Sequence, residues 1–314
     1  MPEESIRVRN NGQINVILHQ HRDVAVNNPN EVEIVTEPSN LFHEHQILVE
    51  MEEELEQFIG LKEMKQLLRE IYAWVTMNKQ RQEFGLKTEG QMLHMLFTGN
   101  PGTGKTTMAR LVGKMLFKMN VLSKGHFIEA ERADLVGEYI GHTALKTRDL
   151  IKKAQGGILF IDEAYSLGRG GEKDFGREAI DTIVKHVEDK QHDFIVILAG
   201  YSSEMNYFIR MNPGLDSRFP IVVKFPDYST DELLAISEKM LRDKQYKLSN
   251  RAKEKMHNHL SIFGDNGNKF QFSNARYVRN IIEKAIRSQS IRLLTYQNVD
   301  RNDLMTLRCI DLNL

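Results

Sequence analysis

Only one cysteine, Cys309, occurs among the 314 residues of this sequence. An intrachain disulfide is therefore excluded, and a reducing compartment suits the chain. Long apolar runs are also missing: the longest, such as Gly157–Ile161 and Phe194–Ala199, fall far short of the roughly 20 residues that a membrane-spanning helix needs. Residues 1–30 show no secretory signal, since no long apolar stretch follows a basic start. We therefore expect a cytoplasmic protein without a membrane span.

An excess of charge of one sign is absent as well. The 42 basic and 43 acidic residues leave a formal net charge of −1. Proteins that bind duplex nucleic acid usually carry a basic excess, because neutralising phosphates drives their affinity. The totals speak against nucleic acid as the main partner, although a local basic patch is compatible with them. The hydrophobic content of 41% is enough for one large or two smaller cores.

The first 50 residues differ in character from the rest. Apolar and polar residues alternate on both sides of Asn11-Gly12, a pair that readily forms a tight hairpin turn. Pro29 and Pro38 interrupt the stretch that follows. We predict an N-terminal extension over residues 1–50, either a hairpin or a mobile arm. Two interpretations stay open: a docking arm for a partner, and a poorly ordered terminus.

Short apolar strands alternate with helical stretches from residue 92 onwards. The predicted strands are Met92–Thr98, His126–Glu129, Ile158–Ile161, Phe194–Ala199 and Ile221–Phe225. The helical stretches between them include Thr106–Lys118, Thr143–Ala154 and Glu178–Glu188. Strands that are apolar on both faces and joined by helices indicate a parallel sheet covered by helices. With the helical stripe that starts at Leu61, this pattern predicts an α/β domain over residues 51–226.

The pattern changes after Pro226-Asp227. Three amphipathic stretches follow, Thr230–Lys244, Asn250–Phe263 and Asn274–Tyr296, and we expect no further strand among them. Residues 227–314 are therefore predicted to form a small helical domain.

A glycine-rich segment lies between the first predicted strand and the next helix. It reads G-N-P-G-T-G-K-T and matches G-x-x-x-x-G-K-[ST] in the strand–helix context that supports a phosphate-binding loop. The glycines let backbone N–H groups turn toward anionic oxygens, and the helix presents its positive N-terminal end. We expect Lys105 to neutralise the β- and γ-phosphates of ATP and the Thr106 hydroxyl to bind Mg²⁺. The predicted nucleotide-binding residues here are Gly99, Asn100, Pro101, Gly102, Thr103, Gly104, Lys105, Thr106 and Thr107.

Two carboxylates, Asp162 and Glu163, follow the apolar strand Ile158–Ile161. Ligands of open α/β sheets sit at this carboxyl end of the strands. We expect Asp162 to hold the Mg²⁺ shell and Glu163 to orient the attacking water, because phosphoryl transfer needs a positioned nucleophile more than a strong base. Taken alone, the pair would be interpreted as an acidic cap after a strand. The phosphate-binding loop upstream favours the catalytic role.

These segments together resemble the AAA+ ATPases, and in particular the CbxX/CfqX group that includes red-type Rubisco activases. The resemblance covers about residues 50–300. It rests on Ile59-Gly60-Leu61, the glycine-rich loop, Leu135–Thr143, Ile158–Tyr165, Val196–Tyr201, Asn212–Phe219 and Asn274-Ala275-Arg276. Within the group the chain resembles a branch from spore-forming bacteria, which implies a role in sporulation. A Rubisco-activase-like function is the alternative.

The resemblance implies an AAA+ α/β core with a C-terminal helical lid, assembled as a homo-hexamer with ATP at the subunit interfaces. It implies that Ile59 and Gly60 border the adenine and that Arg276 senses the γ-phosphate from the lid. Arg218 would be the arginine finger that reaches a neighbour's γ-phosphate and stabilises the transition state. Arg210 is the second candidate finger. A surface arginine remains open for Arg218, and a solvated arginine at a helix start for Arg276.

The chain departs from many AAA+ proteins at Ala199-Gly200-Tyr201, where a polar Asn or Thr commonly aligns the water. Whether Tyr201 takes that role stays open.

Tyr139-Ile140-Gly141 has the aromatic–apolar–glycine form of an AAA+ pore loop. The other interpretation is a hydrophobic anchor at a helix start, with Thr143 as the helix cap. Gly168–Gly176, which contains Arg169 and Lys173, would be a second pore loop or a surface connection. The hypothesis is a remodelling ATPase that pulls an unidentified protein substrate through a central pore. A nucleic-acid motor, and a scaffold that binds ATP without turnover, are the rival classes.

Three histidine pairs at spacing i, i+2 invite a metal interpretation. On a helix such residues do not face one another, whereas on a strand they share a face. No cysteine lies near any pair, so we expect solvated histidines and Mg²⁺ with ATP as the only metal. The pairs are His19 and His21, His43 and His45, and His257 and His259.

Overall fold

The computed structural model describes residues 46–314 except 89, 140, 171–173, 190–192 and 266–272, and only the backbone of residues 263–265. Its centre is a parallel sheet of five strands in the order β2-β3-β4-β1-β5. The strands are β1 (Met95–Gly99), β2 (Phe127–Ala130), β3 (Ile158–Ile161), β4 (Ile195–Gly200) and β5 (Ile221–Phe225). The predicted α/β class with a parallel sheet is confirmed.

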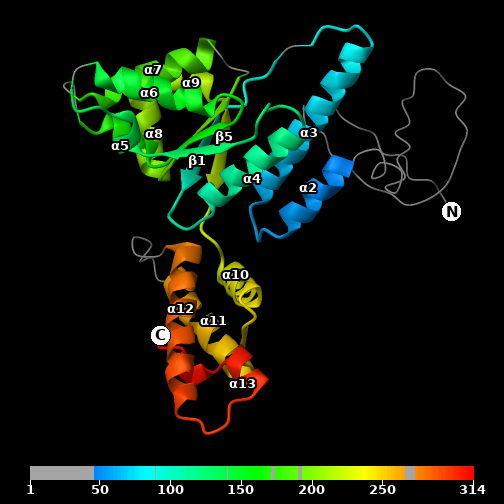
Figure 1. The fold of residues 1–314 in the computed structure, drawn as a ribbon, viewed down its shortest axis with the longest axis vertical. Coiled ribbons are helices and arrows are strands. Elements are labelled where there is room, and N and C mark those ends of the chain that lie inside the picture. Colours follow the sequence, from blue (N-terminus) through cyan, green and yellow to red (C-terminus); the bar gives the residue numbers. More distant parts are fainter. Residues whose placement is uncertain (1–45, 89, 140, 171–173, 190–192, 266–272) are drawn as a thin grey trace, which may run out of the picture. The chain divides into compact units, whose positions relative to one another are not determined.

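Helices cover both faces of this sheet (Figure 1). On one face lie α3 (Lys62–Glu83) and α4 (Lys105–Lys118), and Gly113 of α4 packs against the Ile158 side chain. The other face packs against the helices between β2 and β5, and its core includes Leu96, Ile161 and Val196. Those helices are α5 (Arg132–Leu135), α6 (His142–Ala154), α7 (Gly176–Asp189), α8 (Ser202–Met211), α9 (Gly214–Arg218) and the 3₁₀ turn η1 (Ala164–Gly168).

The middle strands are buried along their whole length. Every residue of β1, β3 and β4 is buried, and most are Val, Ile, Leu, Phe or Met. Strands covered on both faces have this near-continuous apolar composition. Because all strands run in one direction, the segments that follow β1, β3 and β4 emerge at the same edge of the sheet. This edge carries the candidate site.

Helix α2 (Gln46–Glu56) is the first element that the structure describes. The hairpin predicted around Asn11-Gly12 lies outside the described residues, and so do His19, His21, His43 and His45.

The C-terminal part is helical, as expected, and contains α10 (Thr230–Asp243), α11 (Asn250–Asp265), α12 (Asn274–Leu294), α13 (Arg301–Met305) and the short turn η2 (Cys309–Asp311). Its own core includes Leu233, Met256, Leu260, Val278 and Ile282. The expectation of no further strand was wrong. Two short strands, β6 (Lys247–Leu248) and β7 (Thr306–Leu307), pair in parallel, and two residues are too few to show an apolar alternation.

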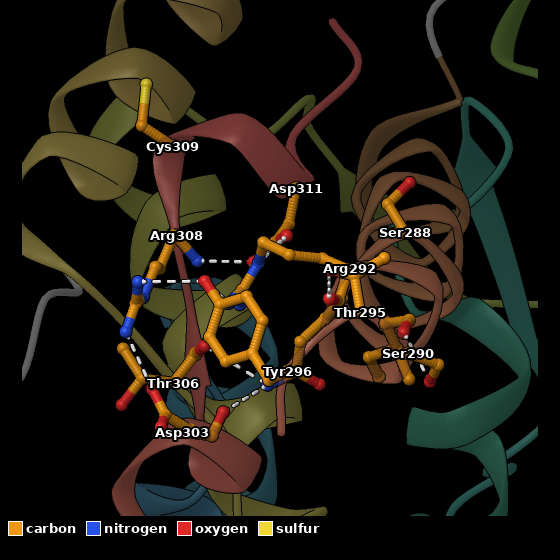
Figure 2. A network of polar contacts seen from close by, with 12 residues as sticks. Ser288, Ser290, Arg292, Thr295, Tyr296, Asp303, Thr306, Arg308, Cys309 and Asp311 are labelled. Atoms are coloured by element: carbon orange, nitrogen blue, oxygen red, sulfur yellow. Dashed lines mark hydrogen bonds and ion pairs between the residues drawn. The ribbon is translucent and has the colours of Figure 1, made fainter. Parts of the chain in front are cut away.

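A polar network connects the end of the chain to α12 (Figure 2). We call its members, Arg292, Tyr296, Arg308 and Asp311, the C-terminal clasp. Arg292 donates to Asp311 from Nε (2.7 Å) and from Nη2 (2.9 Å), and Asp311 is 1% exposed. The backbone N–H of Arg308 donates to the same carboxylate at 2.7 Å. The phenol oxygen of Tyr296 lies 3.1 Å from Arg292 Nη1 and 3.3 Å from Arg308 Nη1. Hydrogen bonding to Asp311 raises the pKa of Arg292 above its usual range, against the opposing effect of burial.

Among the described residues, no helix is long and apolar enough to cross a membrane.

Candidate functional site

A cavity of about 460 Å³ lies where the segments after β1, β3 and β4 meet the C-terminal helices. It brings together most of the residues that the sequence singled out. Those that line it are Ile59, Pro101, Gly102, Gly104, Lys105, Thr106, Thr107, Asp162, Glu163, Tyr201 and Arg276. Gly60, Gly99, Asn100 and Thr103 belong to the same segments but are not among the residues that line the cavity.

The glycines of the loop between β1 and α4 are needed for its shape. Gly102 and Gly104 have φ of +73° and +95°, values that L side chains rarely adopt. A Cβ at Gly99 would lie 2.3 Å from the carbonyl oxygen of Phe225, so this position also has no room for a side chain. The loop can therefore approach a ligand with its backbone.

Lys105 begins α4 and is largely buried at the floor of the loop. Its ammonium group donates to the carbonyl oxygens of Gly99 (2.8 Å) and Asn100 (2.9 Å). Burial lowers the pKa of Lys105, and the negative charge of Asp162 opposes this shift. The lysine is thus placed between the loop and the carboxylates that follow β3.

Asp162 and Glu163 follow the last residue of β3. The N–H of Asp162 donates to Ala130 O at 3.0 Å, which continues the pairing of β3 with β2. Glu163 has φ of +47°, and its N–H donates to Asp162 Oδ1 at 3.0 Å. This left-handed residue turns the chain out of the strand and into η1, and Glu163 itself is exposed.

The oxygen groups around the cavity suit a hard divalent cation. The Thr106 hydroxyl and the Asp162 carboxylate belong to two different segments that line the same cavity. Hydroxyl, carboxylate and phosphate oxygens are the ligands that Mg²⁺ prefers. No group of three or more His, Cys, Asp or Glu residues that could hold a metal by itself occurs in the described part of the chain. The donor set therefore fits a cation that a phosphate helps to bind.

The opposite end of the cavity is formed by Ile59 and its neighbours together with α10. Gly60 has φ of +70°, and a Cβ there would lie 2.7 Å from the Glu232 carboxylate near the start of α10. Ile236 and Met240 of α10 add apolar surface at this end. Apolar surface next to a phosphate-binding loop suits a nucleobase.

Several lining residues were missed by the sequence reasoning. Tyr228 lines the cavity and donates from its hydroxyl to Thr103 O at 3.0 Å, and burial together with the charge of Glu232 raises its pKa to about 12. Arg279 lies one turn after Arg276 on α12, and this i, i+3 spacing could have revealed it. Lys239 and Asp243 of α10 carried no sequence signal.

Arg218 does not line the cavity. It ends α9 and forms an ion pair with Glu188, with 2.5 Å between Nη2 and Oε2. Its Nη1 donates to Gly214 O at 2.9 Å. Arg210 lies near the end of α8 and is exposed. Within one chain, neither candidate finger belongs to the group that the cavity brings together.

Tyr201 comes directly after β4 and is half-buried. Its ring lies 5.6 Å from the ring of Tyr165, measured between centroids. Burial and the charge of Glu163 raise the pKa of Tyr165 above its usual range, so its phenol stays protonated. The rings of Tyr165 and Tyr201 therefore lie close to Glu163.

Tyr139 is 65% exposed, and its ring meets His142 edge-on at 5.4 Å. Gly141 has φ of +80° and is the N-cap of α6, whereas Ile140 lies outside the described residues. Thr143, which the alternative interpretation of this segment made the helix cap, does not cap it. Thr143 is fully buried inside the first turn, and its hydroxyl accepts from the N–H of Gly137 at 2.9 Å. The hydrogen bond between Gly137 and Thr143 thus holds the start of this loop against α6, while Tyr139 is exposed to solvent.

The second glycine-rich segment is described in part. Arg169 lies over the ring of Tyr165, with its guanidinium carbon 4.6 Å from the centroid, and Lys173 lies outside the described residues. Asp174 pairs with Arg132 at 2.5 Å. Burial by itself would raise the pKa of Asp174, but the hydrogen bonds from Arg132 and the Gly176 N–H lower it.

The one histidine pair that the structure describes lies on α11. His257 Nε2 is 3.5 Å from Asp231 Oδ1, and His259 Nε2 is 2.6 Å from the hydroxyl of Tyr277. The two side chains thus have separate partners.

The sheet, the glycine loop, the paired carboxylates and the helices over the cavity together define a P-loop nucleotide-binding protein with a helical lid. Comparison with protein-family models gives the same division. Residues 95–227 match the ATPase family associated with various cellular activities (AAA), and residues 229–314 match an AAA lid domain. The chain belongs to the AAA ATPase family, and it is therefore an enzyme that binds and hydrolyses ATP.

Individual relatives show which branch of the AAA ATPase family the chain resembles. Over 314 residues the chain is 56% identical to "Stage V sporulation protein K" of Bacillus subtilis, covering 100% of this chain and 98% of that protein. It is 43% identical to "Protein CbbX" of Cereibacter sphaeroides over 80% of this chain and 79% of the relative. It is 41% identical to the chloroplastic ribulose bisphosphate carboxylase/oxygenase activase of Cyanidioschyzon merolae over 85% and 90%. The resemblance to the CbxX/CfqX group is confirmed.

Proposed function

We propose that this AAA ATPase uses the energy of ATP hydrolysis to remodel a protein substrate in the cytoplasm during sporulation. The observation that carries the proposal is the single cavity lined by Lys105, Thr106, Asp162, Glu163 and Arg276. In it the loop N–H groups and Lys105 bind the phosphates, Arg276 contacts the γ-phosphate from the lid, and Ile59 and Gly60 border the base. Glu163 orients the attacking water. Bound Mg²⁺, held by Thr106 and Asp162, would neutralise phosphate charge.

The position of Arg218 supports assembly into a ring. Arg218 lies outside its own chain's cavity, as an arginine that acts on a neighbour's nucleotide must. We propose a homo-hexamer in which Arg218 completes the adjacent site, and a division into an N-terminal extension (1–50), an ATPase domain (51–226) and a lid (227–314).

The exposed Tyr139 beside the left-handed Gly141 supports a protein substrate. An exposed aromatic ring can grip many polypeptide side chains through apolar contact. The sporulation role is supported by the relative that spans the whole chain. The relative named as a ribulose bisphosphate carboxylase/oxygenase activase supports the alternative, remodelling of a Rubisco-type carboxylase.

The Glu163→Gln variant tests the proposal. It should bind MgATP and assemble, but turn over no ATP, because the amide cannot polarise the attacking water. Purified from sporulating cells with ATP bound, it should retain the protein substrate, whereas a Lys105→Ala/Glu163→Gln control that cannot hold ATP should not. Normal turnover by Glu163→Gln would refute the role of Glu163. Retention of a carboxylase in place of a sporulation protein would favour the alternative.

A further inference from the structure

The carbonyl groups of the phosphate loop point to an additional function of the lid. Lys105 Nζ donates hydrogen bonds to the carbonyl oxygens of Gly99 and Asn100, and the Thr103 hydroxyl also donates to Asn100 O. The next three carbonyls accept from residues that follow β5. Pro101 O accepts from Asn274 Nδ2 (3.3 Å), Gly102 O from the N–H of Ala275 (3.2 Å), and Thr103 O from the Tyr228 hydroxyl (3.0 Å).

These hydrogen bonds determine where the loop N–H groups point. A trans peptide is planar, so the N–H of each residue is directed opposite to the C=O of the residue before it. With the carbonyls of residues 101–103 turned to the lid, the N–H groups of residues 102–104 are turned away from it. Within the described part of the chain, these three N–H groups take part in no hydrogen bond.

Asp227 and Asn274 hold this arrangement together. Asn274 is fully buried, has φ of +47°, and also accepts from the N–H of Tyr228 at 3.0 Å. Its amide donates to Asp227 Oδ1 at 2.8 Å. Asp227 in turn accepts from the side chain of Asn100, 2.9 Å from each carboxylate oxygen. The start of α12 lies so close that a Cβ at Gly102 would be 2.0 Å from Ser273 O.

We propose that Asp227, Tyr228 and Asn274 form a lid latch: positioning residues that orient the N–H groups of the phosphate loop toward the phosphates of the nucleotide. The latch rests on the proposed function of the cavity and adds to it. Displacement of the lid would release three loop carbonyls at once, so the grip on phosphate depends on the lid even where Arg276 makes no contact. None of the three residues needs to touch the reacting atoms.

Binding of MgADP by the full-length protein tests the latch, because ADP lacks the γ-phosphate assigned to Arg276. The double variant Tyr228→Phe/Asn274→Gly removes two of the three donors. Phenylalanine keeps the ring, and glycine accepts the positive φ of residue 274. Titration calorimetry should show MgADP affinity weakened by about tenfold or more, since each lost hydrogen bond costs part of that factor.

Gln289→Ala is the matched control. Gln289 is buried in the same lid, and its amide donates to the carbonyls of Asp303, Leu304 and Thr306, far along the chain from the phosphate loop. Its loss should lower the melting temperature but leave MgADP affinity within about twofold of the parent. Exchange of the amide hydrogens of residues 102–104 in the MgADP complex should accelerate in the double variant alone.

Two results would overturn the latch: parental MgADP affinity in the double variant, or an equal loss of affinity in Gln289→Ala. A parent protein that does not bind MgADP at all would overturn the proposed function of the cavity itself.

Discussion

Arg218 and Glu188 are ion-paired within one chain, at 2.5 Å, on the surface formed by α7 and α9. Arg218 is 23% exposed and Glu188 is 64% exposed, so the carboxylate can leave the pair at little cost. In the proposed ring, the γ-phosphate of a neighbour's nucleotide would compete with Glu188 for Arg218, because it offers several charged oxygens to the planar guanidinium.

A mixing experiment can show whether Arg218 acts on a neighbouring subunit. Arg218→Ala alone should lower ATP turnover by about 10³-fold or more, and Glu163→Gln alone should abolish it. Mixed together, the two variants should regain part of the activity. The Glu163→Gln subunit supplies its Arg218 to a neighbour whose Glu163 is intact. Turnover is measured by phosphate release at several mixing ratios, and a mixture no more active than its parts would contradict action in trans.

Tyr139→Ala should separate ATP hydrolysis from substrate handling. The side chain is exposed and lies outside the nucleotide cavity, so basal turnover should stay within about twofold of the parent. Substrate-stimulated turnover and remodelling should be lost, because the apolar contact with the polypeptide is gone. Tyr139→Phe keeps the ring and should behave as the parent does. Full remodelling by Tyr139→Ala would exclude gripping by this loop.

The C-terminal clasp should contribute strongly to lid stability. Asp311→Ala leaves Arg292, which is 12% exposed, without its bidentate partner, and should cost about 3 kcal/mol of unfolding free energy. Asp303→Ala is the comparison, because Arg308 of that pair is 47% exposed and its loss should cost about 1 kcal/mol or less. Urea unfolding monitored by circular dichroism gives both values. Equal costs would show that burial does not determine the contribution of the clasp.

Stability of the lid should fall in mild acid because of His259. Burial and the charge of Lys255 lower its pKa below the usual 6.5, so the folded protein favours the neutral ring. The unfolded chain binds the proton more readily, and the stabilisation is therefore complete above about pH 6.5 and lost as the pH falls through the folded-state pKa.

Melting temperatures between about pH 7.5 and about pH 5 test this effect. His259→Phe should show a shallower decline than the parent. His257→Asn, which replaces the other histidine of α11, is the comparison variant. A parental slope in His259→Phe would assign the acid sensitivity to other groups.

The sequence predicted the elements whose pattern is local. Strands Ile158–Ile161 and Ile221–Phe225 were predicted to the residue, since each apolar run is bounded by polar or turn residues. The first strand was predicted to start at Met92 but pairs only from Met95, because Leu93 and His94 are buried without belonging to the ladder. The pairing partner, which decides where a strand begins, is distant in sequence.

By itself, the sequence determined the phosphate loop and the acidic pair, because both are defined by neighbouring residues. The loop needs glycines at positive φ and a lysine at a helix start, and the acidic pair directly follows an apolar strand. Only the tertiary structure decided which distant residues complete the cavity. Tyr228, Lys239 and Asp243 carry no motif that assigns them to it, and they line it because the chain returns to the loop after β5. The same holds for Arg218, whose distance from its own chain's cavity follows from packing rather than from spacing along the chain.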